Sequence, residues 1–384
     1  MEKPKKILIV AGEPSGDLHA ANLVKAIKET GMSFSFFGIG GEKLQNQGVD
    51  LYYDLTKVAV VGFFEVLKNI KKFRRVFKGI LREAEKQKPD AAILVDYPGF
   101  NLRLAKELKK RDIPVIYYIS PQIWAWGKDR IKQIRQNVDR MIVLFSFEEA
   151  LYRKSDVPVS FVGHPLLDVA KPSLTREEFL KKSGLDPRKL TVALLPGSRE
   201  KEVKTLLPVM LETVEIINGN FAKRIQFVIL RSPSVKEEIF IKAAANTRDL
   251  TLKTVSGMAY EGIASSDFAL VCSGTATLET GILATPMAIL YKVNFLTWLF
   301  IRSMIKIPYI GLVNVVKGRK IVEEFIQFDC RAKKIADYVI PVLHDEEKRN
   351  RLKSELLSIR DSLGESGATR RASATVVDFL RNLP

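Results

Sequence analysis

Short, uninterrupted apolar runs recur along the whole chain, and helical patterns separate most of them. Strands that are buried on both faces of a parallel sheet have this continuous apolar character, whereas strands with one solvent-exposed face alternate. In the first half such runs lie at 7–11, 34–38, 91–95, 115–119, 141–145 and 160–162. Because helices lie between them, the pattern predicts an open parallel α/β sheet.

The pattern restarts in the second half, with runs at 191–195, 226–230, 250–254, 268–272 and 287–291. A polar stretch with two prolines, at 163–173, separates the two sets and is typical of an interdomain connection. We therefore predict an α/β chain with two doubly wound Rossmann-like domains, at 1–165 and 166–345, facing each other across a cleft. The remaining segment, 346–384, is charged and helical in pattern.

Composition narrows the classes of site that the chain can hold. Its two cysteines, Cys272 and Cys330, are too few for a disulfide scaffold or a Cys-rich metal site and fit a reducing cytosol. The three histidines, His19, His164 and His344, lie far apart, so we expect no metal and no cofactor. No apolar run is long enough for a membrane span, which takes about 18 residues, and the first run is too short for a secretion signal.

The net charge of +17 is concentrated in one stretch, because 68–88 holds nine cations and only two acids. Apolar residues interleave with these cations at helical spacing. The stretch is therefore either an ordinary helix with its apolar face in the core, or a basic amphipathic helix on an anionic bilayer. Nucleic acid would also attract it, but no nucleic-acid-binding motif accompanies it. The membrane interpretation assigns bilayer or acyl contact to Val61, Phe63, Phe64, Leu67 and Ile70.

Three loops of the first domain follow predicted strands, where ligands of parallel α/β sheets bind. Ser15 and Asp17 lie in the glycine-containing loop at 12–17, where they can cap a helix or contact a substrate. Asp96 comes directly after the run at 91–95 and is a general base or a helix cap. Trp124 and Trp126 lie in the third loop, where they form core or a platform for a sugar or acyl chain.

Two loops of the second domain are suited to phosphate. Gly197, Ser198 and Arg199 combine close backbone approach with a guanidinium. In the other loop, Ser273, Gly274 and Thr275 open a predicted helix, whose N-terminus attracts anions, and Glu279 lies one turn further on, where it can accept from ribose hydroxyls. The dinucleotide glycine fingerprint and the P-loop lysine are missing, which disfavours an oxidoreductase or a P-loop enzyme.

Taken together, the motifs closely resemble the lipid-A-disaccharide synthase family of inverting GT-B glycosyltransferases. The matching segments are GEPSGD (12–17), VGFFEVL (61–67), DYPGFN (96–101), SPQIWAW (120–126), FVGHP (161–165), LLPGSR (194–199) and SGTATLE (273–279). The resemblance implies transfer from UDP-2,3-diacylglucosamine to 2,3-diacylglucosamine 1-phosphate. The products would be a β-1′,6-linked lipid A disaccharide 1-phosphate and UDP.

The resemblance also implies residue roles and partners. Asp96 and Arg199 match positions essential for activity, and Asn314 and Gln327 match a stretch that helps complete the nucleotide site. Some members have a second aspartate where this chain has Gly99, which makes Asp96 the preferred acid. Members are homodimers that exchange C-terminal segments, and they are peripheral on the cytoplasmic face of the inner membrane. The C-terminal helices, 346–384, are expected to cross back to the first domain.

Two other interpretations remain open. A UDP-sugar epimerase can share the double-Rossmann architecture without needing an apolar surface. A nucleic-acid-binding protein is favoured by charge alone, and steep salt dependence would reveal it.

Overall fold

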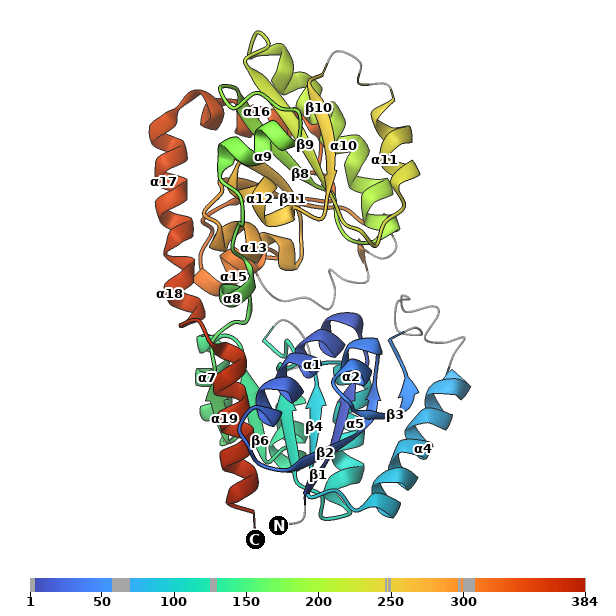
Figure 1. The fold of residues 1–384 in the computed structure, drawn as a ribbon. Helices are drawn as coiled ribbons and strands as arrows, with labels where there is room; N and C mark the ends of the chain where they lie inside the picture. The colour runs from blue at the N-terminus through green and yellow to red at the C-terminus, as the bar shows by residue number, and fades with distance from the viewer. Residues whose placement is uncertain are drawn as a thin grey trace. The chain divides into compact units, whose positions relative to one another are not determined.

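The computed structural model describes residues 4–56, 70–124, 130–245, 247, 250–295, 298–299 and 308–383. The chain divides into two compact units (Figure 1). Unit 1 comprises Met1–Pro165 with Gly364–Pro384, and unit 2 comprises Leu166–Leu363.

Unit 1 is built on a parallel sheet with the strand order β3-β2-β1-β4-β5-β6-β7. The order reverses between β1 and β4, which makes their carboxyl ends the switch point where such sheets bind ligands. The strands are β1 (Lys5–Ala11), β2 (Phe34–Gly40), β3 (Asp50–Asp54), β4 (Ala91–Val95), β5 (Val115–Tyr118), β6 (Arg140–Val143) and β7 (Val159–Phe161). The helices are α1 (Pro14–Lys28), α2 (Glu42–Asn46), α4 (Ile70–Gln87), α5 (Pro98–Lys109), α6 (Arg130–Asn137), α7 (Ser146–Arg153) and α19 (Ala368–Arg381).

Unit 2 repeats the design with the strand order β10-β9-β8-β11-β12-β13. Its switch point lies between β8 and β11, whose carboxyl ends lead to the two phosphate-suited loops. The strands are β8 (Leu190–Leu195), β9 (Ile225–Arg231), β10 (Leu252–Ser256), β11 (Phe268–Cys272), β12 (Met287–Tyr291) and β13 (Glu323–Ile326). The helices are α8 (Leu166–Val169), α9 (Arg176–Lys182), α10 (Glu200–Gly219), α11 (Glu237–Ala244), α12 (Ala259–Ala264), α13 (Thr275–Ile282), α15 (Leu312–Lys317), α16 (Ala332–His344), α17 (Glu346–Leu357) and α18 (Ile359–Leu363).

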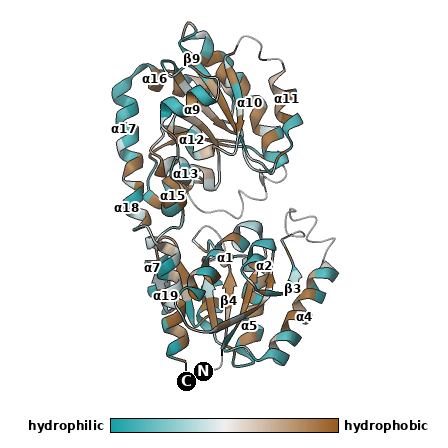
Figure 2. Cartoon of the chain, viewed as in Figure 1, coloured by the Kyte–Doolittle hydropathy of each residue, from teal (hydrophilic) through white to brown (hydrophobic). Residues whose placement is uncertain are grey.

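The predicted class, two parallel Rossmann-like sheets, is confirmed. Each apolar run of the sequence overlaps a strand, and Figure 2 shows hydrophobic strands inside both units. Two strands were not predicted, β3 and β13. Both are edge strands with half-exposed residues and acidic side chains, so they lack the continuous apolar character of the central strands.

The C-terminal segment differs from the prediction, because unit 2 runs to Leu363 instead of ending at 345. Helices α17 and α18 pack against α13, α15 and α16 of unit 2 and bury Leu356, Ile359 and Leu363. Only α19 joins unit 1, where it packs on α1 (Figure 1). Arg371 of α19 also donates from Nε to the Val162 carbonyl over 2.9 Å.

Helix α4 carries the cationic stretch. Val76, Ile80, Leu81 and Ala84 on one face belong to the core of unit 1, as the ordinary-helix interpretation predicts. The cations occupy the exposed faces: Lys71, Lys72, Arg74, Arg75, Lys78, Arg82 and Lys86. All five predicted bilayer contacts lie outside the part of the chain that the structure describes: Val61, Phe63, Phe64, Leu67 and the side chain of Ile70. No helix in the described part of the chain is both long and apolar enough to cross a membrane.

Asp17 links two helices of unit 1. Its buried carboxylate accepts from the backbone amides of Gly41 (2.7 Å), Lys43 (3.1 Å) and Leu44 (3.3 Å), at the start of α2. The carboxylate therefore satisfies amides that the helix itself cannot pair.

We expect Asp17→Ala to lower the free energy of unfolding by about 1–3 kcal/mol, because it leaves these buried amides without an acceptor. Ser15→Ala, on the exposed first turn of α1, is the matched control and should change it by less than about 0.5 kcal/mol. Urea unfolding followed by circular dichroism measures both. Equal effects of the two substitutions would contradict the structural role of Asp17.

Candidate active site

A cavity of about 260 Å³ in unit 1 lies where four neighbouring strands end. Residues that follow the carboxyl ends of β1, β4, β5 and β6 form its wall: Glu13, Asp96, Pro98, Ile119, Ser120, Gln122, Leu144, Phe145 and Glu148. The cavity therefore occupies the switch point of the sheet and contains the predicted acid Asp96.

Asp96 is held in a strained turn between β4 and α5. Both Asp96 (φ +48°) and Tyr97 (φ +47°) have left-handed backbone conformations, which cost about 1–3 kcal/mol each in residues other than glycine. The Asp96 carbonyl accepts from the Tyr117 hydroxyl over 2.6 Å and from Asn101 Nδ2 over 2.8 Å. Its amide donates to the Tyr118 carbonyl over 2.9 Å. These bonds fix the backbone that carries the carboxylate.

Gly12 is required by the same turn. A Cβ atom at Gly12 would lie 2.2 Å from Cδ1 of the Tyr97 ring, closer than any real contact. The loop after β1 therefore approaches the turn after β4 only because position 12 has no side chain.

Two carboxyls in the cavity have a higher proton affinity than usual. Burial, followed by the charge of Glu13, raises the pKa of Asp96 to about 6. Burial raises the pKa of Glu148 to about 7, against the hydrogen bonds from Trp124 and Ser120 that lower it. A base with a pKa near 6 is still ionised at neutral pH but accepts a proton more readily than an ordinary aspartate.

Unit 1 contains a buried histidine, His164, and a half-buried one, His19. Burial, followed by the charge of His19, lowers the pKa of His164 to about 3, and burial also lowers that of His19. His164 packs against the Phe145 ring, with centroids 5.2 Å apart. Among the described residues no group of histidines, cysteines and acids could hold a metal ion.

Glu148 was missed by the sequence analysis. It lies in the first turn of α7, shortly after the carboxyl end of β6, and its side chain accepts from Ser120 and Trp124. The signal that singled out Asp96, an acid close after a buried strand, applies to Glu148 as well.

In unit 2, the loop after β8 has the backbone that the phosphate hypothesis requires. Gly197 has φ +119° and leads directly into α10. However, Glu202 of the same helix accepts from the amides of Ser198 (3.2 Å) and Arg199 (3.3 Å) and pairs with the Arg199 guanidinium over 2.8 Å. The chain's own carboxylate therefore occupies the groups predicted to hold a diphosphate, while the Arg199 side chain stays 76% exposed.

The second predicted loop follows the neighbouring strand, β11. Gly274 (φ +150°) and Thr275 are exposed at the start of α13, and Ser273 Oγ donates to the Ile310 carbonyl over 3.2 Å. The charges of Glu202 and Arg199 both act on the Cys272 thiol, so the structure brings the two loops together. Glu279 accepts from the Tyr260 hydroxyl over 3.1 Å, and burial raises its pKa.

Asn314 and Gln327 have their polar atoms occupied within this chain. Asn314 Oδ1 accepts from the amides of Ile321 (2.8 Å) and Val322 (3.1 Å), and its Nδ2 donates to the Val322 carbonyl (2.9 Å) and to Glu324 (2.8 Å). Gln327 exchanges two hydrogen bonds with the backbone of Val293, at 3.1 and 2.9 Å. Both side chains therefore shape loops of unit 2.

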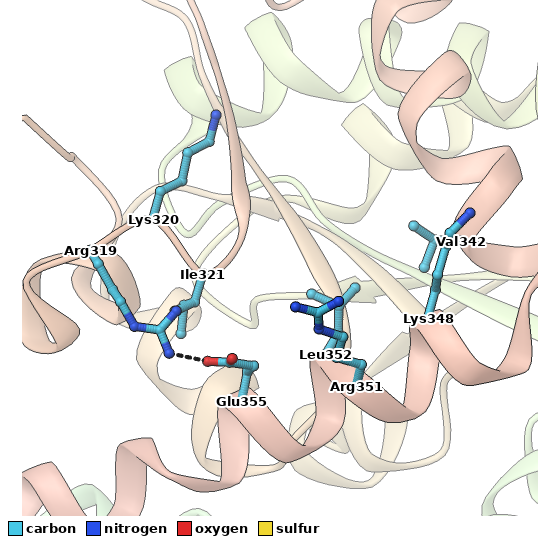
Figure 3. Close-up of a pocket in the computed structure, with 8 residues that line it drawn as sticks. All are labelled: Arg319, Lys320, Ile321, Val342, Lys348, Arg351, Leu352 and Glu355. Carbon is cyan, nitrogen blue, oxygen red and sulfur yellow. Dashed lines mark hydrogen bonds and ion pairs between the residues drawn. The ribbon is translucent and has the colours of Figure 1, made fainter.

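A second cavity, of about 320 Å³, lies in unit 2 beside α17 (Figure 3). Its wall includes Arg319, Lys320, Lys348 and Arg351, but none of the predicted site residues. Acids pair with three of these cations: Glu355 with Arg319, Glu323 with Lys320 and Asp345 with Lys348. Because this pairing offsets most of the positive charge, we do not place the nucleotide there.

Sequence comparisons with known proteins identify one family. The family model described as lipid-A-disaccharide synthetase matches residues 7–377. A lipid-A-disaccharide synthase of Syntrophus aciditrophicus is 43% identical over 377 residues, which cover 98% of both chains.

Solved structures are similar in fold at much lower identity. A glycosyltransferase from Rickettsia africae has a TM-score of 0.58 at 12% identity and covers all of both chains. A UDP-GlcNAc 2-epimerase from Neisseria meningitidis, solved with UDP-GlcNAc, has a TM-score of 0.61 at 11% identity and covers 97% of this chain and all of its own. The architecture is thus that of GT-B glycosyltransferases and UDP-GlcNAc 2-epimerases, and the chain belongs to the lipid-A-disaccharide synthetase family of glycosyltransferases.

Proposed function

We propose that the chain transfers 2,3-diacylglucosamine from its UDP derivative to the 6-hydroxyl of 2,3-diacylglucosamine 1-phosphate. The products are the β-1′,6-linked disaccharide 1-phosphate and UDP, with inversion at the anomeric carbon. The observation that carries the proposal is Asp96, a buried carboxyl with a raised pKa in the switch-point cavity of unit 1. Family membership supplies the substrate class.

The reaction is an in-line displacement. The acceptor 6-oxygen forms a bond to the anomeric carbon of the donor while its proton moves to the Asp96 carboxylate. The bond between that carbon and the diphosphate oxygen breaks, and its electron pair leaves with UDP. Stabilisation of the departing negative charge falls to Arg199, the Gly197–Ser198 backbone and the N-terminus of α13 at Ser273–Thr275.

For the donor diphosphate to bind, Glu202 must release its hydrogen bonds to Ser198 and Arg199. Since Glu202 takes the Ser198 and Arg199 amides and the Arg199 guanidinium, a bound diphosphate would compete with it for the same donors. Glu279, already partnered by Tyr260, is our choice for the ribose hydroxyls. Asn314 and Gln327 act by shaping the loops around the nucleotide, in this chain or in an exchanged segment of a homodimer.

The acceptor side belongs to unit 1. Ser15 is exposed on the first turn of α1, and we assign its hydroxyl to the acceptor phosphate. Asp17 positions α2 instead, because its carboxylate is engaged with backbone amides. The exposed cations of α4 are suited to an anionic bilayer. From family membership we infer that this bilayer is the inner membrane and that the enzyme lies on its cytoplasmic face.

Asp96→Asn should fold and still bind UDP, yet lose disaccharide synthesis by at least about a hundredfold, because an amide cannot accept the proton. The assay uses both lipid substrates, a radiolabelled donor and thin-layer detection of the disaccharide. Incubation with UDP-N-acetylglucosamine alone tests for epimerase activity. Turnover by Asp96→Asn at the wild-type rate would remove Asp96 from the base role.

The pH dependence should report the environment of Asp96. Because the base must be ionised, kcat/KM should rise with pH through about 6 and level off above it. Glu13→Gln removes a neighbouring negative charge that raises the pKa of Asp96, so the midpoint should move to lower pH. Glu148→Gln is the control for the other carboxyl that titrates in the cavity. A midpoint that moves upward in Glu13→Gln would contradict this account.

The cations of α4 should contribute to membrane binding. Replacing Lys71, Arg74, Arg75 and Lys78 by Gln should lower partitioning onto phosphatidylglycerol vesicles by on the order of a thousandfold at low salt, since each cation near such a surface adds about 1 kcal/mol. The control removes four exposed cations of unit 2, Lys201, Lys204, Lys236 and Lys242. Vesicle sedimentation measures both variants, and equal losses would argue for a diffuse effect of net charge.

A further inference from the structure

Glu148 is a buried carboxyl to which the proposed reaction assigns no role. It is 3% exposed and lines the same cavity. One oxygen, Oε1, accepts from Ser120 Oγ over 3.0 Å and from Trp124 Nε1 over 3.1 Å. Burying a carboxyl is costly, so a position of this kind calls for a physical explanation.

These two donors are the first and last residues of one short segment. Residues 120–124 follow β5, after Ile119 turns the chain with φ +66°. Between the two donors lies Gln122, which is exposed and lines the cavity together with Ser120. A single atom of Glu148 thus clamps both ends of the segment that presents Gln122.

Helix α7 supplies further support for the clamp. The Tyr152 hydroxyl lies 3.2 Å from Ser120 Oγ, and the Phe147 ring packs edge-on against Trp124 with centroids 5.5 Å apart. The clamp needs an acceptor at Oε1 and does not need a charge. Burial raises the pKa of Glu148 to about 7, which agrees with a carboxyl that serves as a hydrogen-bond acceptor.

We propose that Glu148 is a positioning residue of an acceptor-sugar subsite. It holds segment 120–124 so that the exposed Gln122 presents its amide to the hydroxyls of a pyranose in the cavity that Asp96 lines. An amide side chain on a rigid loop is suited to sugar hydroxyls, because it can both donate and accept hydrogen bonds. This inference rests on the proposed function, because it assumes that the acceptor occupies the cavity of unit 1.

The kinetic test compares Glu148→Ala with Glu148→Gln. Loss of the clamp in Glu148→Ala should raise KM for the acceptor by about tenfold or more, with KM for the donor and kcat within about threefold of wild type. Glu148→Gln keeps an acceptor oxygen and should restore the acceptor KM. A fall in kcat at unchanged acceptor KM, or failure of Gln to rescue, would overturn the positioning role.

Removal of a donor provides an independent variant. Trp124→Phe keeps a ring against Phe147 but loses the Nε1–H, so it should raise the acceptor KM in the same way. The Trp124→Phe/Glu148→Ala double variant should be no worse than Glu148→Ala, because both changes break the same interaction. If Glu148→Ala fails to fold, two other variants replace it in the kinetic test. Trp124→Phe and Ser120→Ala then serve, because each removes one of the two donors to Glu148. Additive effects would count against the clamp.

A spectroscopic readout does not depend on activity. The chain has three tryptophans, so 5-fluorotryptophan labelling gives three ¹⁹F resonances, and Trp124→Phe assigns one of them. That resonance should shift in Glu148→Ala but not in Glu149→Ala, whose side chain pairs with Arg153. An unmoved resonance in an active enzyme overturns the positioning role alone. Failure of the wild type to make disaccharide overturns the proposed function and, with it, the acceptor subsite.

Discussion

The hydrogen bonds to the Asp96 carbonyl are the constraint on which the cavity of unit 1 depends. Tyr117 and Asn101 bind this carbonyl and hold two successive residues in a left-handed conformation. The strain of the turn is of the order of a few kcal/mol, which hydrogen bonds within a packed sheet can offset. Gly12 leaves room for the Tyr97 ring that this conformation directs toward β1. Without the turn, the carboxylate would not be fixed at the switch point.

The proposed reaction assigns its tasks to the two units by charge. The cavity of unit 1 collects carboxyls whose burial keeps their proton affinity high, as acceptance of a proton requires. The loops of unit 2 collect backbone amides and a guanidinium, which are suited to a leaving diphosphate. In this structure Glu202 accepts from the Ser198 and Arg199 amides and pairs with the Arg199 side chain, so an internal carboxylate contacts the groups that we propose for the diphosphate.

Helix α4 is compatible with both interpretations of the cationic stretch, the core helix and the basic helix on an anionic bilayer. The described apolar face is part of the core, so it is unavailable to a bilayer. The cations face outward and can still attract an anionic surface, because electrostatic attraction does not require insertion. A core helix and a membrane-facing helix are therefore compatible when different faces serve each purpose.

The sequence by itself determined the two parallel sheets, since continuous apolar runs mark strands that are buried on both faces. It also located Asp96 and Arg199, because residues that follow parallel strands lie at the ligand-binding edge. Only the tertiary structure decided the roles of Asp17, Asn314 and Gln327, whose hydrogen-bond partners lie elsewhere in the sequence. The same holds for Glu148, the edge strands β3 and β13, and the placement of α17 and α18. Local pattern records burial and periodicity, whereas the partner of a buried polar group depends on contacts that only the folded chain brings together.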